Sequence, residues 1–346
     1  MTGYLRAFFA NRTARPFAVL VLIVIVLGIG DDGHGRVLTT STAYDVLQQF
    51  ATIGPVALAL GLSMMVGEFD LSVGGILSLA GCVAVMAGSG SPAAGLLLAV
   101  TVGALGGLLQ GTIMTWLNLS SIGVTLGGLL TFGGLSYFLT GNTTIGYDRL
   151  DVALGVNAPL LGIFSARSLT AIILFLVATF VVSWTRFGRD LLAVGSDRRA
   201  ATIVGIRVDR ILIAVFVISG LLTAIGGGLL SYGLAAASPT ALADTLVPGA
   251  AAAILGGVSL SGGKGRPIGI AGGVLVLSML HSGLTAIGVP PFAHWIVTAA
   301  VLFTVGILDG EELSRRVYSF RRAVGQRPDT PPPSASSILV RQQADH

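Results

Sequence analysis

Residues 185–210 read TRFGRDLLAVGSDRRAATIVGIRVDR, and this segment separates two long apolar runs. It is the longest charged interruption in a chain of 346 residues of which only 10% are charged, and it holds six arginines. Its apolar positions are compatible with helix, and three glycines divide it, at positions 188, 195 and 205. The segment therefore predicts two short helices that form a docking element on the cytoplasmic side of a membrane.

The composition places the rest of the chain in that membrane. Hydrophobic residues make up 53% of the chain and the mean hydropathy is +0.87, which is more apolar surface than a soluble domain of this length can bury. Apolar runs of about 18 residues or more predict transmembrane helices, and the 49 glycines suit close helix packing. The sequence pI is 9.6. An excess of arginine in cytoplasmic loops explains this value better than nucleic-acid binding does.

The apolar runs predict an all-α, polytopic membrane protein with about ten transmembrane helices. We expect a transmembrane domain at 17–308, after a basic cytoplasmic head at 1–16 and before a cytoplasmic tail at 309–346. The tail is expected to be partly disordered, because it contains the run PDTPPPSASS. The predicted spans cover residues 17–30, 51–66, 71–87, 93–117, 122–140, 169–184, 211–234, 246–260, 268–287 and 292–308.

The distribution of Lys and Arg gives the orientation of these spans. The head holds three of these residues, the 186–210 segment six, the turn at 261–267 two and the tail six, which is 17 of the 20 in the chain. Positive residues concentrate in cytoplasmic loops. With an even number of spans, this distribution predicts that both termini are cytoplasmic.

Two carboxylates interrupt the apolar pattern at residues 67–74, GEFDLSVG. Charged groups at membrane depth are costly, so Glu68, Asp70 and the neighbouring Ser72 are candidates for translocation or gating. A structural role is equally open, because Asp70 or Ser72 can accept hydrogen bonds from the free amides at the start of the next helix.

A glycine-rich turn at residues 255–265, LGGVSLSGGKG, adds Ser259 and Ser261 to the translocation or gating candidates. The turn contains fragments that look like nucleotide-binding motifs. A phosphate-binding loop, however, would need glycine at position 258 and serine or threonine at 265, where this chain has Val258 and Gly265. We therefore predict that the chain itself binds no ATP and needs no cofactor.

Together, these segments resemble the inner-membrane permeases of carbohydrate-type ATP-binding cassette (ABC) importers, of the ribose and xylose kind. Residues 69–74 resemble the family signature (I/F)DLSVG, and residues 256–265 resemble GG(T/V)SLxGG(K/R)G. The arginine-rich segment matches the family's coupling pattern GR…AVG…AA…GI. The matching residues are Gly188, Arg189, Ala193, Val194, Gly195, Ala200, Ala201, Gly205 and Ile206.

The resemblance implies a non-catalytic permease subunit in the inner membrane of a bacterium. It implies that the coupling residues fit a cleft on a separate cytoplasmic ATPase, which binds the ATP. A second permease subunit and an extracytoplasmic solute-binding protein would complete an importer for a small polar solute, above all a monosaccharide. Introducing a bulky residue, as in Gly195→Trp or Gly205→Trp, should then leave the chain in the membrane and detach the ATPase.

Two other functional classes make different demands on the sequence. An ion-coupled secondary carrier would need a buried carboxylate or a broken helix as a cation site, for which Glu68 and Asp70 are the candidates. A membrane-embedded enzyme would need a catalytic constellation, which the sequence does not offer. His34, His281 and His294 are scattered without metal-ligand spacing, so no metal site is predicted.

Overall fold

A computed structural model describes residues 14–31, 33–240 and 245–309 of the chain, and the side chains up to residue 304. Residues up to Ala299 form one compact unit, and residues from Ala300 on form a second one. The boundary between the two units falls inside the last described helix, Pro291–Asp309. Most of the predicted head and nearly all of the predicted tail lie outside the described residues, so the domain boundaries at 16 and 308 stay predictions.

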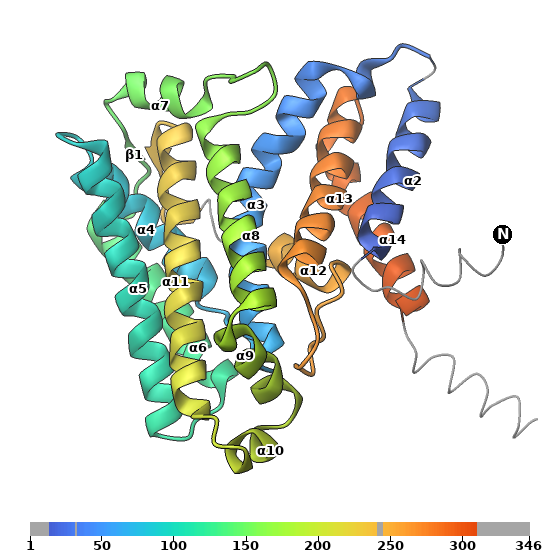
Figure 1. The fold of residues 1–346 in the computed structure, drawn as a ribbon. Coiled ribbons are helices and arrows are strands. Elements are labelled where there is room, and N and C mark those ends of the chain that lie inside the picture. The colour runs from blue at the N-terminus through green and yellow to red at the C-terminus, as the bar shows by residue number, and fades with distance from the viewer. Residues whose placement is uncertain (1–13, 32, 241–244, 310–346) are drawn as a thin grey trace, which may run out of the picture. The chain divides into compact units, whose positions relative to one another are not determined.

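In the described part of the chain, ten apolar helices coincide with the ten predicted spans (Figure 1). They are α2 (Arg15–Gly30), α3 (Thr40–Met65), α4 (Val73–Ala87), α5 (Pro92–Trp116), α6 (Ser121–Thr140), α8 (Ala166–Trp184), α11 (Val208–Gly233), α12 (Leu246–Leu255), α13 (Pro267–Ala286) and α14 (Pro291–Asp309). The shorter elements are the 3-10 helix η1 (Arg36–Leu38), α7 (Leu150–Asn157), α9 (Arg186–Ser196) and α10 (Arg198–Ile203). Strands β1 (Ile145–Gly146) and β2 (Ala236–Ala237) pair antiparallel, at the opposite end of the bundle from α9 and α10.

The lengths of these helices limit what they can cross. Six of the described helices are long and apolar enough to span a membrane: α3, α5, α6, α8, α11 and α13. Helices α4 and α12 have 15 and 10 residues, and at about 1.5 Å per residue they are shorter than a hydrocarbon core of roughly 30 Å. The all-α, polytopic architecture is therefore confirmed, whereas ten complete crossings and the cytoplasmic location of both termini stay predictions.

Two predicted spans differ in length from the observed helices. Helix α3 begins 11 residues before the predicted start at 51, because Thr39 caps it by accepting a hydrogen bond from the Thr42 amide and the helix then runs on through Pro55. Helix α12 ends at Leu255, five residues before the predicted end. The chain leaves the helix there because Gly257 adopts a left-handed conformation with φ of +86°.

Helix α4 forms the centre of one group of helices. It is buried at 12 of its 15 residues and packs against α5, α6 and α11. Helix α3 organises a second group, in which it contacts α8, α12 and α13. Helix α11 joins the two groups, because it packs on α3 as well as on α4 and α5 (Figure 1).

Glycine sets the close approach of α5 to α11, in line with the close helix packing expected from the glycine content of the chain. A β-carbon at Gly103 would lie 2.5 Å from the carbonyl oxygen of Gly220, and a β-carbon at Gly107 would collide with the carbonyl oxygen of Phe216. The same relation joins α12 to α13, where a β-carbon at Gly273 would collide with the Ala252 carbonyl oxygen. These contacts bring backbone against backbone, which is the main source of attraction between helices in lipid.

Candidate functional site

The arginine-rich segment forms two short helices, α9 and α10, and we call residues 185–206 the α9–α10 hairpin. The Thr185 hydroxyl caps α9, and Asp197 Oδ1 caps α10 by accepting hydrogen bonds from the Arg199 and Ala200 amides at 2.8 and 3.0 Å. Gly205 ends α10 with φ of +85°. The prediction of two short helices is therefore confirmed, but Asp197 divides them and Gly188 and Gly195 lie inside α9.

The termination of α10 follows a recognised hydrogen-bond pattern. The Gly205 amide donates to the Thr202 carbonyl and the Ile206 amide donates to the Ala201 carbonyl, both at 3.0 Å. These two bonds, with a left-handed glycine between them, are those of a Schellman motif. Gly205 has no heavy atom near its missing side chain, so its conformation, and not crowding, is what requires glycine there.

One face of the hairpin packs inside the chain. Leu191 and Val194 are 0% and 1% exposed. A β-carbon at Gly195 would collide with the Met65 carbonyl oxygen and would lie 2.6 Å from the Gly263 amide nitrogen. Gly195 therefore holds the hairpin against the rest of the chain, which its sequence pattern did not reveal.

The contacts of Gly195 bring all three sequence motifs to one end of the bundle. Met65 immediately precedes the acidic segment at 67–74, and its carbonyl oxygen accepts a hydrogen bond of 2.9 Å from the Gly263 amide in the glycine-rich turn. A β-carbon at Gly262 would in turn lie 2.5 Å from the Gly195 carbonyl oxygen. The hairpin, the acidic segment and the glycine-rich turn thus form one packed unit.

The opposite face of the hairpin is exposed and partly apolar. Ile203 and Val204 are 85% and 74% exposed at the end of α10. The nine predicted coupling residues divide between the two faces: Gly188, Val194 and Ala201 are buried, Ala193, Gly195 and Ile206 are half-buried, and Arg189, Ala200 and Gly205 are exposed. The exposed set, together with Ile203 and Val204, is the part of the hairpin that a partner can touch.

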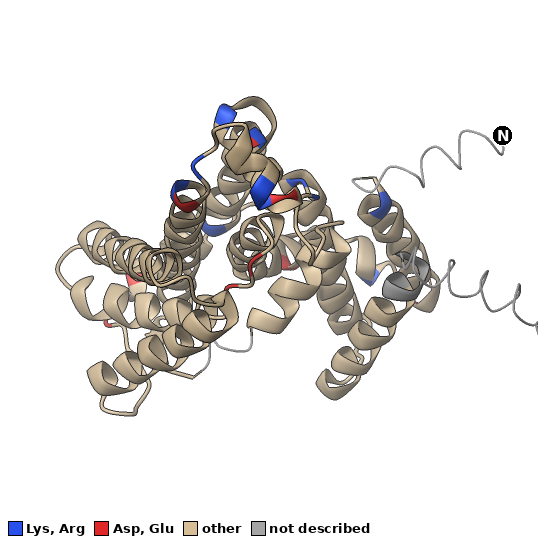
Figure 2. Cartoon of the chain, turned by 90° about the horizontal axis from the view of Figure 1, so that it is seen from below, with Lys and Arg blue, Asp and Glu red and all other residues tan. Residues whose placement is uncertain are grey.

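Arginine and lysine concentrate at this end of the bundle. Figure 2 views the chain from the end that carries α9 and α10, and it shows these residues gathered around the hairpin and the adjoining turns. Six arginines belong to residues 186–210, and Lys264 and Arg266 follow the glycine-rich turn. The positive charges of the 186–210 segment and of the turn at 261–267 therefore lie on one surface, which is the distribution expected of a cytoplasmic face. The arginines of the predicted tail and two of the three in the predicted head lie outside the described residues.

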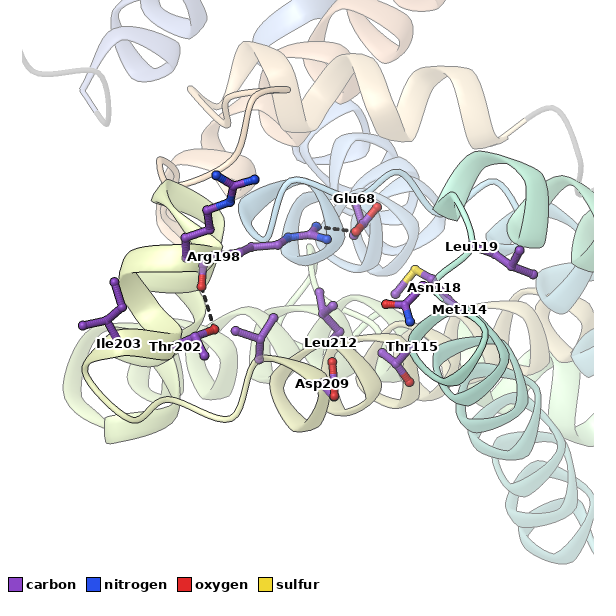
Figure 3. A pocket seen from close by; sticks show the side chains of 12 residues that line it. Glu68, Met114, Thr115, Asn118, Leu119, Arg198, Thr202, Ile203, Asp209 and Leu212 are labelled. Atoms are coloured by element: carbon purple, nitrogen blue, oxygen red, sulfur yellow. Dashed lines mark hydrogen bonds and ion pairs between the residues drawn. The ribbon is translucent and has the colours of Figure 1, made fainter.

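An ion pair ties the acidic segment to α10. Arg198 Nη2 is paired with Glu68 Oε1 and donates to the Val66 carbonyl oxygen at 3.4 Å. The pair lies at the edge of a cavity of about 570 Å³ between the hairpin, the end of α5 and the start of α11 (Figure 3). Its walls include Met114, Thr115, Asn118, Leu119, Thr202, Ile203, Asp209 and Leu212.

Asp70 is buried and fully engaged with neutral donors. It is 1% exposed, and its Oδ1 accepts from the amide and the hydroxyl of Ser72 at 3.1 and 2.5 Å. Its Oδ2 accepts from the Ser219 hydroxyl of α11 at 2.7 Å. Asp70 thus fixes the residue before α4 and connects it to α11, which supports the structural alternative for Asp70. Ser72 is the N-cap residue of α4 but makes no side-chain cap bond, so the capping role predicted for Ser72 is wrong.

The Asp70 network extends to α5 and α6 through residues that the sequence analysis missed. Gln110 Nε2 of α5 donates to the Ser72 hydroxyl oxygen at 2.7 Å, and Thr125 of α6 donates to the Phe69 carbonyl oxygen at 3.1 Å. A lone glutamine in an apolar span was the one available signal for Gln110. Hydroxyl residues such as Thr125 and Ser219 are too common in such spans to stand out.

The remaining candidates, Ser259 and Ser261, lie in the glycine-rich turn. Ser259 donates its amide to the Lys264 carbonyl at 3.1 Å, and its hydroxyl oxygen accepts from the Ser261 amide at 3.2 Å. Their hydrogen bonds in the described structure are within the turn, and they are not part of the Asp70 network. Their predicted role in translocation stays a prediction.

The fold and the site define a multi-pass helical membrane protein whose acidic segment and glycine-rich turn pack against a basic helical hairpin. Residues 42–306 match the family described as "Branched-chain amino acid transport system / permease component". The chain belongs to this family, and it is a permease component of the multi-pass, bacterial inner-membrane class.

Several curated relatives are sugar permeases. The chain is 34% identical to the ribose import permease protein RbsC of Bacillus subtilis over 305 residues, which cover 85% of this chain and 91% of the relative. It is 30% identical to RbsC of Escherichia coli K12 over 302 residues, with 85% and 92% covered. It is 29% identical to the xylose transport system permease protein XylH of the same strain, with 84% and 90% covered. No significant match to a solved structure was found.

Proposed function

We propose that this chain forms the solute pathway of an ABC importer for a small polyhydroxylated solute, a monosaccharide above all. The names of the ribose and xylose permeases support the sugar class. The family description names branched-chain amino acids. An amino acid carries two charges that would need charged partners at membrane depth, whereas the buried polar groups around Asp70 are mainly hydroxyl and amide groups.

The observation that carries the proposal is the two-faced hairpin. Its inner face is locked to Met65 and Gly263, and its outer face leaves Ile203 and Val204 exposed at a basic surface. Apolar groups exposed together on a water-facing surface indicate a partner. We propose that this partner is a separate cytoplasmic ATPase, whose movement the hairpin transmits to the ends of α3 and α13.

The remaining partners follow from the same assignment. A second permease subunit would complete the pathway, and an extracytoplasmic solute-binding protein would deliver the solute. The ATP would be bound by the ATPase, so this chain would carry no cofactor and no catalytic activity. Movement of the hairpin would switch the opening of the pathway from one side of the membrane to the other.

An ion-coupled secondary carrier is less consistent with the site. Both carboxylates that could hold a cation already have partners, since Glu68 is paired with Arg198 and Asp70 accepts from Ser72 and Ser219. A carrier would need a free carboxylate or unwound backbone oxygens facing a cavity.

Reconstitution into liposomes distinguishes these functions. The chain is co-reconstituted with its cognate ATPase and binding protein, and uptake of D-ribose, D-xylose, D-fructose and L-leucine is measured. ATP on the side of the membrane that carries the ATPase should drive accumulation of one of the sugars. A proton or sodium gradient alone should not drive it. Uphill uptake by the chain alone under an ion gradient would refute the proposal, and uptake of L-leucine in place of the sugars would refute the sugar class.

A further inference from the structure

A second cavity, of about 510 Å³, lies between α5 and α6. Its polar wall consists of Gln110, Ser120 and Thr131, and glycines 123, 127 and 128 line it from α6. This wall has no charged residue. Gly123 and Gly127 have no heavy atom of the described residues within 4 Å of the position that a β-carbon would take. Close packing within the described chain therefore does not require glycine there, and the two glycines leave space open in the cavity.

Gln110 presents an unused acceptor in the wall of this cavity. The Ser72 hydroxyl donates its proton to Asp70 Oδ1 at 2.5 Å, so the Ser72 oxygen can only accept from Gln110. The amide nitrogen of Gln110 therefore faces Ser72, at 2.7 Å, and its Oε1 must point elsewhere. Oε1 is buried and has no hydrogen-bond partner among the described residues, and such an atom at membrane depth is costly.

Gly128 of α6 lies directly against Gln110 Oε1, and only its backbone covers that oxygen. A β-carbon at Gly128 would collide with Gln110 Oε1, so any other residue there would force the Gln110 side chain or α6 to shift. Helix α6 is anchored mainly on α4 and makes few contacts with α5. A displacement of α6 from Gln110 would uncover Oε1 on the side of the cavity that Gln110 lines.

The cavity also adjoins the polar cavity beside the hairpin. Leu119, in the turn between α5 and α6, lines both of them. The cavity beside the hairpin has the Glu68–Arg198 pair at its edge, at the basic end of the bundle. A polar solute that leaves the α5–α6 cavity past Leu119 thus meets polar and charged side chains, which a lipid chain would not tolerate.

We propose that the cavity between α5 and α6 is a binding station on the solute pathway, where a hydroxyl group of a sugar-like solute donates a hydrogen bond to Gln110 Oε1 when α6 moves off it. The inference rests on the proposed transport function. A sugar fits because its hydroxyl groups supply the missing donor, and because the open glycines and Thr131 offer a small, uncharged wall.

The first test measures whether water and sugar enter the cavity. In a Cys82→Ala background, which removes the only cysteine, Gly127→Cys and Thr131→Cys are treated with the water-soluble anionic reagent methanethiosulfonate ethylsulfonate. Leu130→Cys is the matched control, since Leu130 is 71% exposed on the same helix but does not line the cavity. We expect both cavity cysteines to react, millimolar D-ribose, D-xylose or D-fructose to slow the reaction, and the control to stay unreactive.

The second test fills the cavity. Gly127→Leu should abolish ATP-driven uptake, whereas Gly134→Leu, at another open and exposed glycine of α6, should leave it near the native rate. Gln110→Met should weaken the apparent affinity for the sugar by about threefold to tenfold, the effect of one neutral hydrogen bond. Ser72→Ala, which also breaks the network but keeps Oε1, should preserve more of that affinity.

The outcomes separate this inference from the function on which it rests. If the cavity cysteines do not react, the cavity is filled by lipid or protein, and the proposed binding site between α5 and α6 is refuted. Native uptake in Gly127→Leu would overturn it as well, while leaving the importer intact. Absence of ATP-driven uptake by the native chain with its partners would instead refute the proposed function.

Discussion

The Ser219 hydroxyl lies 2.7 Å from Asp70 Oδ2, although 149 positions separate the two residues in the sequence. This bond joins the start of α4 to the middle of α11, and both residues are buried. Hydrogen bonds from neutral donors to a buried carboxylate stabilise more than bonds between neutral groups. This hydrogen bond therefore connects the acidic segment to α11, the helix that packs on both groups of helices.

We predict that Ser219→Ala destabilises the purified chain by about 1.5 to 3 kcal/mol, because a buried carboxylate loses a donor. Thr170→Val is the control, since the Thr170 hydroxyl is exposed and bonds only to its own helix, at the Ala166 carbonyl. Thermal unfolding in detergent measures both variants. Equal unfolding temperatures for the two would show that the Ser219–Asp70 bond contributes nothing to stability.

The packing of Gly195 revises the outcome expected for substitutions in the hairpin. The sequence pattern predicted that Gly195→Trp would spare folding and detach the ATPase. Because even a β-carbon would collide with the Met65 carbonyl oxygen, we now expect Gly195→Trp to reduce the yield of folded protein. Size-exclusion chromatography of the detergent-purified variant checks this, and a native-like peak at native yield would contradict the contact.

The exposed face of the hairpin gives a cleaner test of docking. Ile203→Glu should keep the native yield, since Ile203 is 85% exposed, and it should abolish co-purification of the proposed ATPase. Leu154→Glu is the matched control, because Leu154 is 66% exposed on α7, at the opposite end of the bundle. If Ile203→Glu retained the ATPase as well as Leu154→Glu does, the docking surface would lie elsewhere.

The ion pair between Arg198 and Glu68 predicts rescue by charge exchange. Arg198→Glu places two carboxylates together at the edge of the cavity and should weaken the coupling of ATP hydrolysis to uptake, and Glu68→Arg should have a similar effect. Arg198 is 45% exposed, so we expect only about 0.5 to 1 kcal/mol of stability from the pair. The double variant should recover coupling, measured as solute transported per ATP hydrolysed. Additive loss in the double variant would rule out a direct pairing.

The glycine contact between α5 and α11 predicts that a Gly→Ala substitution changes stability in opposite directions at a packed position and at an open position. Gly107→Ala should lower the unfolding temperature, because its β-carbon collides with the Phe216 carbonyl oxygen. Gly133→Ala, where nothing lies within 4 Å, should raise it, by an amount that corresponds to roughly 1 kcal/mol of helix propensity. Unfolding in detergent, followed by circular dichroism, measures both. A stabilised Gly107→Ala would mean that the two helices are not in backbone contact.

The helices and the hairpin could be predicted from the sequence because their signals are local. The lengths of apolar runs give the spans, and Asp197 and Gly205 mark where α9 ends and where α10 begins and ends. The family could also be inferred, since its motifs are short and contiguous. The helix ends differ from the predicted ones by up to 11 residues, where Thr39 caps α3 early and where the left-handed Gly257 ends α12.

The partners of the polar groups were not available from the sequence. Composition and spacing singled out Asp70 but could not say that Ser219 and Gln110 reach it, or that Gly195 faces inward. His281 and His294, which looked scattered in the sequence, lie with ring centroids 5.1 Å apart.

What the sequence determined by itself is therefore the set of helices and their place in a membrane, because apolar length and turn residues act within a few positions of the chain. What the tertiary structure decided is which of the few polar groups meet. In an apolar bundle, that choice depends on which helix faces pack together and on where glycine lets two backbones touch.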